Sequence, residues 1–94
     1  MSPGVPDPGD DHHEAVIGPV LGFWFACYTV RDGEGYWGYA KLCADRPADV
    51  WHTPDAVMKV GSGPHALPER ALLGVVGQAR RQLERRVAAM PWFP

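Results

Sequence analysis

The sequence predicts an α+β domain in which an antiparallel three-stranded sheet packs on one long C-terminal helix, in the order β-β-β-α. Residues 22–43 contain two runs of aromatic and β-branched side chains around a polar break at residues 31–35, which is the pattern of a β-hairpin. Apolar side chains recur at helical spacing through residues 68–90, and Pro91 follows them. The chain of 94 residues suffices for one small domain, which we place at residues 20–94.

Residues 1–19 are predicted to form a disordered acidic tail, because they are rich in proline and glycine and have little apolar surface to offset the entropy of ordering. Their charge is −4, whereas residues 69–94 carry +3, so the tail and the helix could bind each other or compete for a partner. The adjacent His12 and His13 are interpreted as solvated side chains. A flexible segment gives them no fixed geometry for a metal ion, so no metal is expected.

The expected hairpin register pairs Val30 with Tyr36 and leaves the residues between them as the turn. Even-numbered side chains of both strands then share one face, and odd-numbered side chains share the other. The even face has small residues at its centre and larger ones such as Trp24 and Leu42 around them, a shape that admits a helix. We therefore assign the even face to the core, although a slip of one residue would exchange the two faces.

The position of the third strand stays open between residues 50–53, residues 56–60, and both stretches with a bend at Pro54. A proline at that point favours an edge strand or a bulge. Glycine and proline punctuate the chain again before the helix, so a turn is expected at residues 62–67.

The helix is expected to begin at Pro68 and Glu69, because proline suits the first turn and a carboxylate suits the positive end of the helix dipole. Its apolar stripe consists of Leu72, Val75, Val76, Ala79, Leu83, Val87 and Met90. Gly74 and Gly77 lie off this stripe, so we do not attribute them to close packing against the sheet.

One helix covers only one face of a small sheet, so the odd face is expected to have no cover within the chain. This candidate partner-binding face consists of Phe23, Phe25, Trp37, Tyr39 and Lys41. A large apolar patch of this kind marks an interaction site, and symmetric self-association is the commonest way to cover one. We therefore expect a non-enzymatic protein-interaction or dimerisation module that forms a homodimer or binds another protein.

The basic residues of the helix suggest an alternative function. Four of them form a cluster, made of Arg80, Arg81, Arg85 and Arg86. We interpret the cluster as a solvated helix face, because cations suit the C-terminal end of a helix. In the alternative, these arginines contact phosphates and the sheet aromatics stack on bases, which would make a nucleic-acid-binding module.

No catalytic residue, cofactor site or metal site is predicted, and no enzymatic activity is expected. The sequence has no phosphate loop and no metal-binding spacing of cysteines or histidines, and neither His52 nor His65 has a positioned nucleophile beside it. The register separates Cys27 from Cys43 by roughly 13 Å along the sheet, too far for a disulfide. Free thiols, with no signal-peptide pattern and no apolar run of membrane-spanning length, predict a cytoplasmic protein.

The hairpin with its glycines and Tyr36, followed by Gly63 and the helix start at residues 68–71 (Pro-Glu-Arg-Ala), resembles the β-β-β-α module of HicB-like antitoxins. The resemblance covers residues 22–88. The order of elements is also similar to that of small uncharacterised bacterial β-β-β-α proteins. The resemblance implies this fold and a toxin-binding or dimerising module rather than an enzyme.

Overall fold

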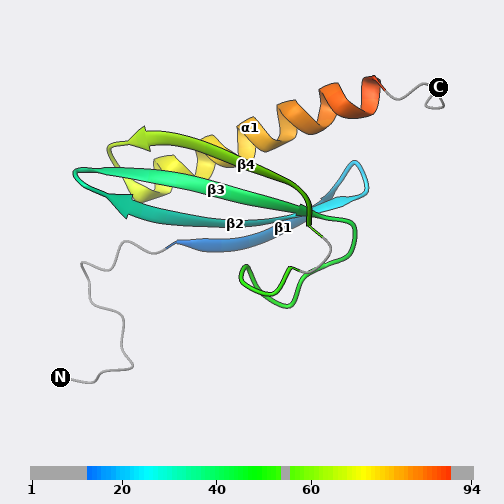
Figure 1. The fold of residues 1–94 in the computed structure, drawn as a ribbon, viewed down its shortest axis with the longest axis horizontal. Helices are drawn as coiled ribbons and strands as arrows, with labels where there is room; N and C mark the ends of the chain where they lie inside the picture. The colour runs from blue at the N-terminus through cyan, green and yellow to red at the C-terminus, as the bar shows by residue number, and fades with distance from the viewer. Residues whose placement is uncertain (1–12, 54–55, 90–94) are drawn as a thin grey trace.

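Four antiparallel strands form a single sheet, and one helix lies across one of its faces (Figure 1). The computed structural model describes residues 13–53 and 56–89. Its elements are β1 (Glu14–Val20), β2 (Phe23–Asp32), β3 (Gly35–Cys43), β4 (Ala56–His65) and α1 (Pro68–Ala88). The strands lie in the sheet in chain order, and α1 packs over β2, β3 and β4. The α+β class with an antiparallel sheet and a C-terminal helix is confirmed, but the predicted number of strands was wrong.

The additional strand, β1, comes from residues that we had assigned to the tail, except for its last residue, Val20. It pairs with β2 as an edge strand, with Ile17 opposite Phe25, and a bulge follows at residues 18–19. Ala15 and Ile17 share the face of the sheet that carries Phe25, because directly paired residues point to the same side. The short apolar run of β1 is therefore sufficient for an edge strand, which pairs with a neighbouring strand on one side only. The rest of the predicted tail, residues 1–12, lies outside the described residues.

The predicted hairpin register was wrong by one residue. Asp32 pairs with Gly35, so the turn between β2 and β3 has only two residues, and Gly33 adopts a φ of 64° there. A positive φ at this position is what the favoured two-residue hairpin turns require, and glycine adopts it without strain. The tight turn extends both strands and places Leu42 opposite Phe25 instead of Trp24. Odd-numbered residues of β2 and even-numbered residues of β3 consequently face α1.

The core lies between α1 and this face of the sheet. It is built from Phe25, Cys27, Ala40, Leu42, Val60, Val75, Ala79 and Leu83. Val75, Ala79 and Leu83 belong to the predicted stripe of the helix and are buried. The other described members of that stripe, Leu72, Val76 and Val87, are partly buried against the core, and Met90 lies outside the described residues.

The third strand of the predicted sheet corresponds to β4, which covers the alternative at residues 56–60 and continues to His65. Residues 50–53 belong instead to the loop before it, and the turn predicted at residues 62–67 was wrong for its first four positions. This part of β4 pairs with β3 through a bulge, where the register shifts between Tyr36 and Gly38. Glycines are compatible with a strand at such a bulge.

The helix α1 begins at Pro68, as predicted, with Glu69 in its first turn. The expectation that Gly74 is not explained by close packing against the sheet was wrong. A Cβ at this position would lie 2.8 Å from the imidazole ring of His65 in β4. The glycine therefore leaves room for a side chain of the sheet, and close packing does explain it. Within residues 13–53 and 56–89, no helix combines the length and the apolar character needed to span a membrane.

Candidate functional site on the outer face of the sheet

The face of the sheet that points away from α1, called the outer face here, carries even-numbered side chains of β2 and odd-numbered side chains of β3. Trp37, Tyr39 and Lys41 of the predicted partner-binding face lie on it. Phe25 does not, because the true register places it in the core with no exposed surface. The prediction for Phe23 was also wrong, since this side chain is half-buried and packs against the core. The structure thus brings together three of the five predicted residues.

Four aromatic side chains form a continuous row on the outer face. We call them the aromatic row, and they are Trp37, Tyr39, Tyr28 and Trp51. The ring centroids of Trp37 and Tyr39 are 6.4 Å apart, those of Tyr39 and Tyr28 are 5.5 Å apart, and both pairs are stacked. The Trp51 ring follows 4.8 Å from that of Tyr28, tilted by 46°. These separations are typical of stabilising aromatic contacts.

Sequence reasoning missed two members of this row. Tyr28 was assigned to the core only because of the one-residue error in register, so a correct turn prediction would have found it. Trp51 lies in the loop between β3 and β4 and is 55% exposed. No local pattern in the sequence indicates that this loop folds back across the sheet.

The loop at residues 44–53 covers one end of the outer face, on the side of the sheet opposite α1 (Figure 1). Its Val50 side chain is buried, as are Ala26 and Cys43, which point to the same face of the sheet. The expectation that this face has no cover within the chain was therefore wrong at this end. The aromatic row and the lysines beyond the loop remain accessible in part.

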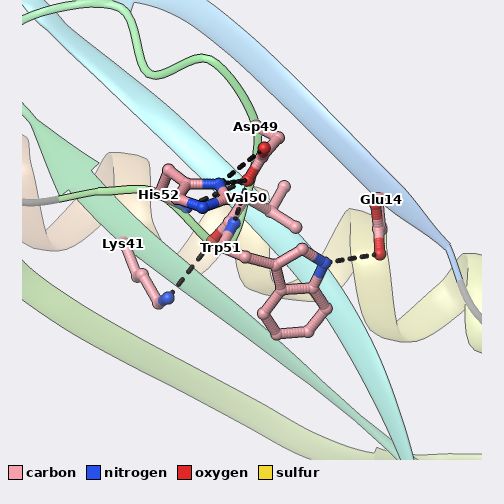
Figure 2. A network of polar contacts seen from close by, with 6 residues as sticks. All are labelled: Glu14, Lys41, Asp49, Val50, Trp51 and His52. Carbon is pink, nitrogen blue, oxygen red and sulfur yellow. Dashed lines mark hydrogen bonds and ion pairs between the residues drawn. The ribbon is translucent and has the colours of Figure 1, made fainter.

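Polar contacts from three parts of the chain hold the loop in place (Figure 2). Lys41 Nζ donates a hydrogen bond of 3.2 Å to the carbonyl oxygen of Val50. The same ammonium group lies 5.5 Å from the ring centroid of Tyr28 and 5.7 Å from that of Trp51, within cation–π range. Trp51 Nε1 donates to a carboxylate oxygen of Glu14 in β1 at 3.1 Å.

Asp49 fixes the backbone of the loop at Trp51. Its carboxylate accepts hydrogen bonds from the backbone N–H groups of Trp51 at 2.7 Å and His52 at 2.9 Å. His52 Nδ1 lies 2.8 Å from the same carboxylate. The hydrogen bond with the His52 side chain, followed by that from the Trp51 backbone, lowers the pKa of Asp49. This arrangement is a structural turn on the surface, and it orients Trp51 toward Tyr28.

A hollow of about 360 Å³ opens beside the aromatic row. We call it the lysine hollow, and its lining residues are Tyr28, Tyr39, Ala40, Lys41, Lys59, Val60 and Gly61. Lys41 and Lys59 are direct cross-strand partners, so their side chains project from neighbouring strands on the same face. No carboxylate is among the described residues that line the hollow. The site can therefore offer two ammonium groups and two tyrosine rings to one ligand.

The predicted arginine cluster lies elsewhere. Arg80, Arg81, Arg85 and Arg86 are exposed on α1, which occupies the opposite side of the sheet from the aromatic row. Arg81 donates a hydrogen bond of 3.0 Å to Gln78 of the same helix. The structure does not bring the arginines and the sheet aromatics into one surface.

The titratable and nucleophilic side chains outside this face do not form a catalytic arrangement within the described ranges. Ser62 Oγ lies 3.1 Å from His65 Nε2, but this pair is partly buried between β4 and α1. Cys27 and Cys43 are both buried and are not joined by a disulfide, and they point to opposite faces of the sheet. No group of three or more metal-ligating side chains occurs in residues 13–53 and 56–89.

The chain was compared with models of protein families, with curated proteins and with solved structures, and none of the three comparisons found a match.

Proposed function

We propose that the protein is a non-enzymatic interaction module that binds an acidic, extended segment of a partner protein on its outer face. The observation that carries this proposal is the direct pairing of Lys41 with Lys59 beside the aromatic row. Like charges directly opposite one another on neighbouring strands destabilise a sheet. A carboxylate bound in the lysine hollow would relieve that repulsion, so the pair favours an anionic ligand.

The aromatic row supports a ligand of extended shape. Its rings span from β3 across β2 to the loop, so together they offer a strip of apolar surface rather than a single pocket. Aromatic side chains dominate the energetics of protein interfaces, and aromatic-lined surfaces recognise proline-rich segments in the polyproline II conformation. A segment that combines carboxylates with prolines would match both the lysines and the rings.

A second copy of the chain fits this surface less well than an acidic partner. In a twofold dimer through the outer face, each Lys41–Lys59 pair would approach the corresponding pair of the other copy unless the axis lay far from the hollow. Juxtaposed like charges suppress such pairings. The proposed partner is therefore a different acidic segment, and an interaction module of this kind also fits the resemblance to HicB-like antitoxins.

The nucleic-acid alternative has weaker support. Two lysines on the outer face provide little of the phosphate neutralisation on which nucleic-acid affinity depends. The arginine cluster cannot add to it, because α1 lies on the other side of the sheet.

The proposal is tested by titrating the full chain with a synthetic peptide of alternating glutamate and proline, and with a lysine–proline peptide of equal length. We expect the acidic peptide alone to shift the amide resonances of Tyr39, Lys41 and Lys59. Lys59→Glu is expected to weaken binding about tenfold or more, and Lys59→Arg to retain it, since Lys59 is exposed and its charge is what the site uses. Equal affinity for both peptides, or shifts confined to α1, would reject the proposal.

Single-stranded RNA serves as the competing ligand in the same assay. Tight binding that falls steeply with salt would favour the nucleic-acid alternative instead.

A further inference from the structure

We propose that the side of α1 nearest β1 is a homodimer interface, in which the helices of two copies pack antiparallel about a twofold axis. The residues that carry it are Glu69, Leu73, Val76 and Arg80, called the lateral stripe here. The lateral stripe lies on the opposite side of the sheet from the aromatic row, because α1 does. The inference therefore goes beyond the proposed function and does not depend on it.

The residues of the lateral stripe share one side of α1. They follow one another at intervals of four, three and four residues, which is the spacing of a coiled-coil seam. At 3.6 residues per turn, they fall within about 60° of one another around the helix. The same spacing continues to Leu83 and Val87, which already pack against the core. The accessible part of the seam is thus the part from Glu69 to Arg80.

Contacts on the two sides of α1 show where the lateral stripe points. Gly74 leaves room for His65 of β4, so its side of the helix faces β4. A carboxylate oxygen of Glu69 lies 4.0 Å from Nε2 of His13, the residue that precedes β1. The lateral stripe therefore faces the β1 side. Since β1 is not among the strands over which α1 packs, the sheet does not cover this side of the helix.

The centre of the lateral stripe is apolar and accessible. Leu73 is the most exposed of the large apolar side chains in the described part of the chain, with 70% of its surface accessible. Val76, one turn further along, is only half-buried against the core. Single exposed apolar residues are common on protein surfaces, whereas neighbouring ones at seam spacing are typical of a helix that packs against another. A second helix in this position would bury both side chains.

The charges at the ends of the lateral stripe match those of a second copy. Glu69 lies four residues before Leu73, and 60% of its side chain is exposed. Arg80 lies four residues after Val76 and is also exposed. An antiparallel pair in which the two apolar residues face each other therefore places Glu69 of each copy opposite Arg80 of the other. The twofold axis forms this pair of opposite charges twice.

The same charges exclude a parallel arrangement. A parallel pair would place every residue of the lateral stripe opposite its own counterpart, glutamate against glutamate and arginine against arginine. Juxtaposed like charges suppress such pairings. The lateral stripe is therefore complementary to itself in the antiparallel direction only.

Sedimentation equilibrium of the full chain over a concentration series up to about 1 mM tests for the dimer. We expect the mass to rise toward twice that of the monomer, and Leu73→Glu to stay monomeric throughout, because it places a charge at the centre of the interface. Leu73 is largely exposed, so this substitution leaves the core intact. A chain that stays monomeric at the highest concentration, or a dimer that survives Leu73→Glu, would overturn the proposal.

Charge reversal tests the antiparallel arrangement. Glu69→Arg and Arg80→Glu are each expected to weaken dimerisation about tenfold or more, because each creates two pairs of like charges. The double variant Glu69→Arg/Arg80→Glu is expected to restore the affinity to within about threefold, because opposite charges face each other again.

Arg81→Glu is the matched control for these reversals. It makes the same change of charge as Arg80→Glu, but Arg81 comes seven residues after Gly74 and therefore lies on the β4 side of α1. We expect this variant to dimerise like the unmodified chain. Equal weakening by Arg80→Glu and Arg81→Glu, or a double variant that dimerises no better than the single ones, would overturn the pairing of Glu69 with Arg80.

Discussion

Gly38 of β3 lies directly beneath the backbone of Ala71 in α1. A Cβ at Gly38 would overlap the carbonyl group of Ala71 and would come within 2.9 Å of the Cβ of Val75. This close approach between the sheet and the helix therefore depends on the absence of a side chain at Gly38. Neither backbone can move without disturbing the core around Val75, which is fully buried.

Gly38→Ala is therefore expected to destabilise the fold. The added methyl group forces the helix away from β3, and overpacking of this kind costs about 2–3 kcal/mol. Urea denaturation followed by tryptophan fluorescence measures the loss. A change within about 0.5 kcal/mol, the range of an ordinary surface substitution, would show that α1 does not approach β3 as described.

Gly77→Ala is expected to have the opposite effect. The nearest atom to a Cβ at Gly77 is the guanidinium Nη1 of Arg81 at 3.4 Å, and this flexible side chain can move away. Alanine favours a helix interior by about 1 kcal/mol over glycine, so the variant should be more stable in the same urea experiment. Gly74→Ala is the matched comparison, because its Cβ would press on the ring of His65. Equal stabilisation by both substitutions would contradict the packing of His65 under α1.

The hairpin register predicts that Phe25 and Trp37 differ sharply in their contribution to stability. Phe25 has no exposed surface and lies in the core, so Phe25→Ala should lower the free energy of unfolding by about 3–5 kcal/mol. Trp37 is half-buried on the outer face, and Trp37→Ala should cost less than half as much. The same substitution should weaken binding of the acidic peptide. Similar losses of stability for the two variants would place both residues on one face, as the sequence alone had suggested.

The contrast between Phe25 and Trp37 shows how much of the structure could be predicted from the sequence. The hairpin, the start of α1 and the apolar positions Val75, Ala79 and Leu83 follow from local patterns, since strand and helix periodicities are properties of neighbouring residues. The choice of face depends on whether Gly33 takes a positive φ and closes a two-residue turn, which shifts every cross-strand pair by one. Local periodicity does not determine that choice.

The candidate site was harder to predict than the fold. Trp51 reaches the aromatic row only because Lys41 holds the carbonyl of Val50 and Glu14 accepts the indole N–H, and these contacts join three segments distant in sequence. The pairing of Lys41 with Lys59 likewise depends on the register of β4, which the proline and glycines of that region left open. Long-range contacts of this type have no periodic signature.

The last prediction concerns Cys27, whose side chain lies in the core with no exposed surface. Burial raises the pKa of its thiol from the ordinary 9.0 to about 12, because the thiolate would be desolvated. Above pH 9 the unfolded chain therefore releases a proton that the folded chain retains. The contribution of this group to stability is fully present below pH 9 and is lost as the pH rises toward 12, with a limiting slope of about 1.4 kcal/mol per pH unit.

Urea denaturation of the unmodified chain and of Cys27→Ala at pH 8, 9 and 10 measures this slope, since every other ionisable group is common to the two proteins and cancels in the difference. Cys27→Ala is expected to be less stable at pH 8, because it leaves a small cavity beside Ala40, its partner on β3. The difference in stability between the two proteins should then narrow by about 1.4 kcal/mol between pH 8 and pH 10, because only the unmodified chain carries the penalty of a thiol that cannot ionise in the core. Parallel stability curves for the two proteins would mean that the Cys27 thiol ionises as readily in the folded chain as in the unfolded one, and hence that water reaches this part of the core.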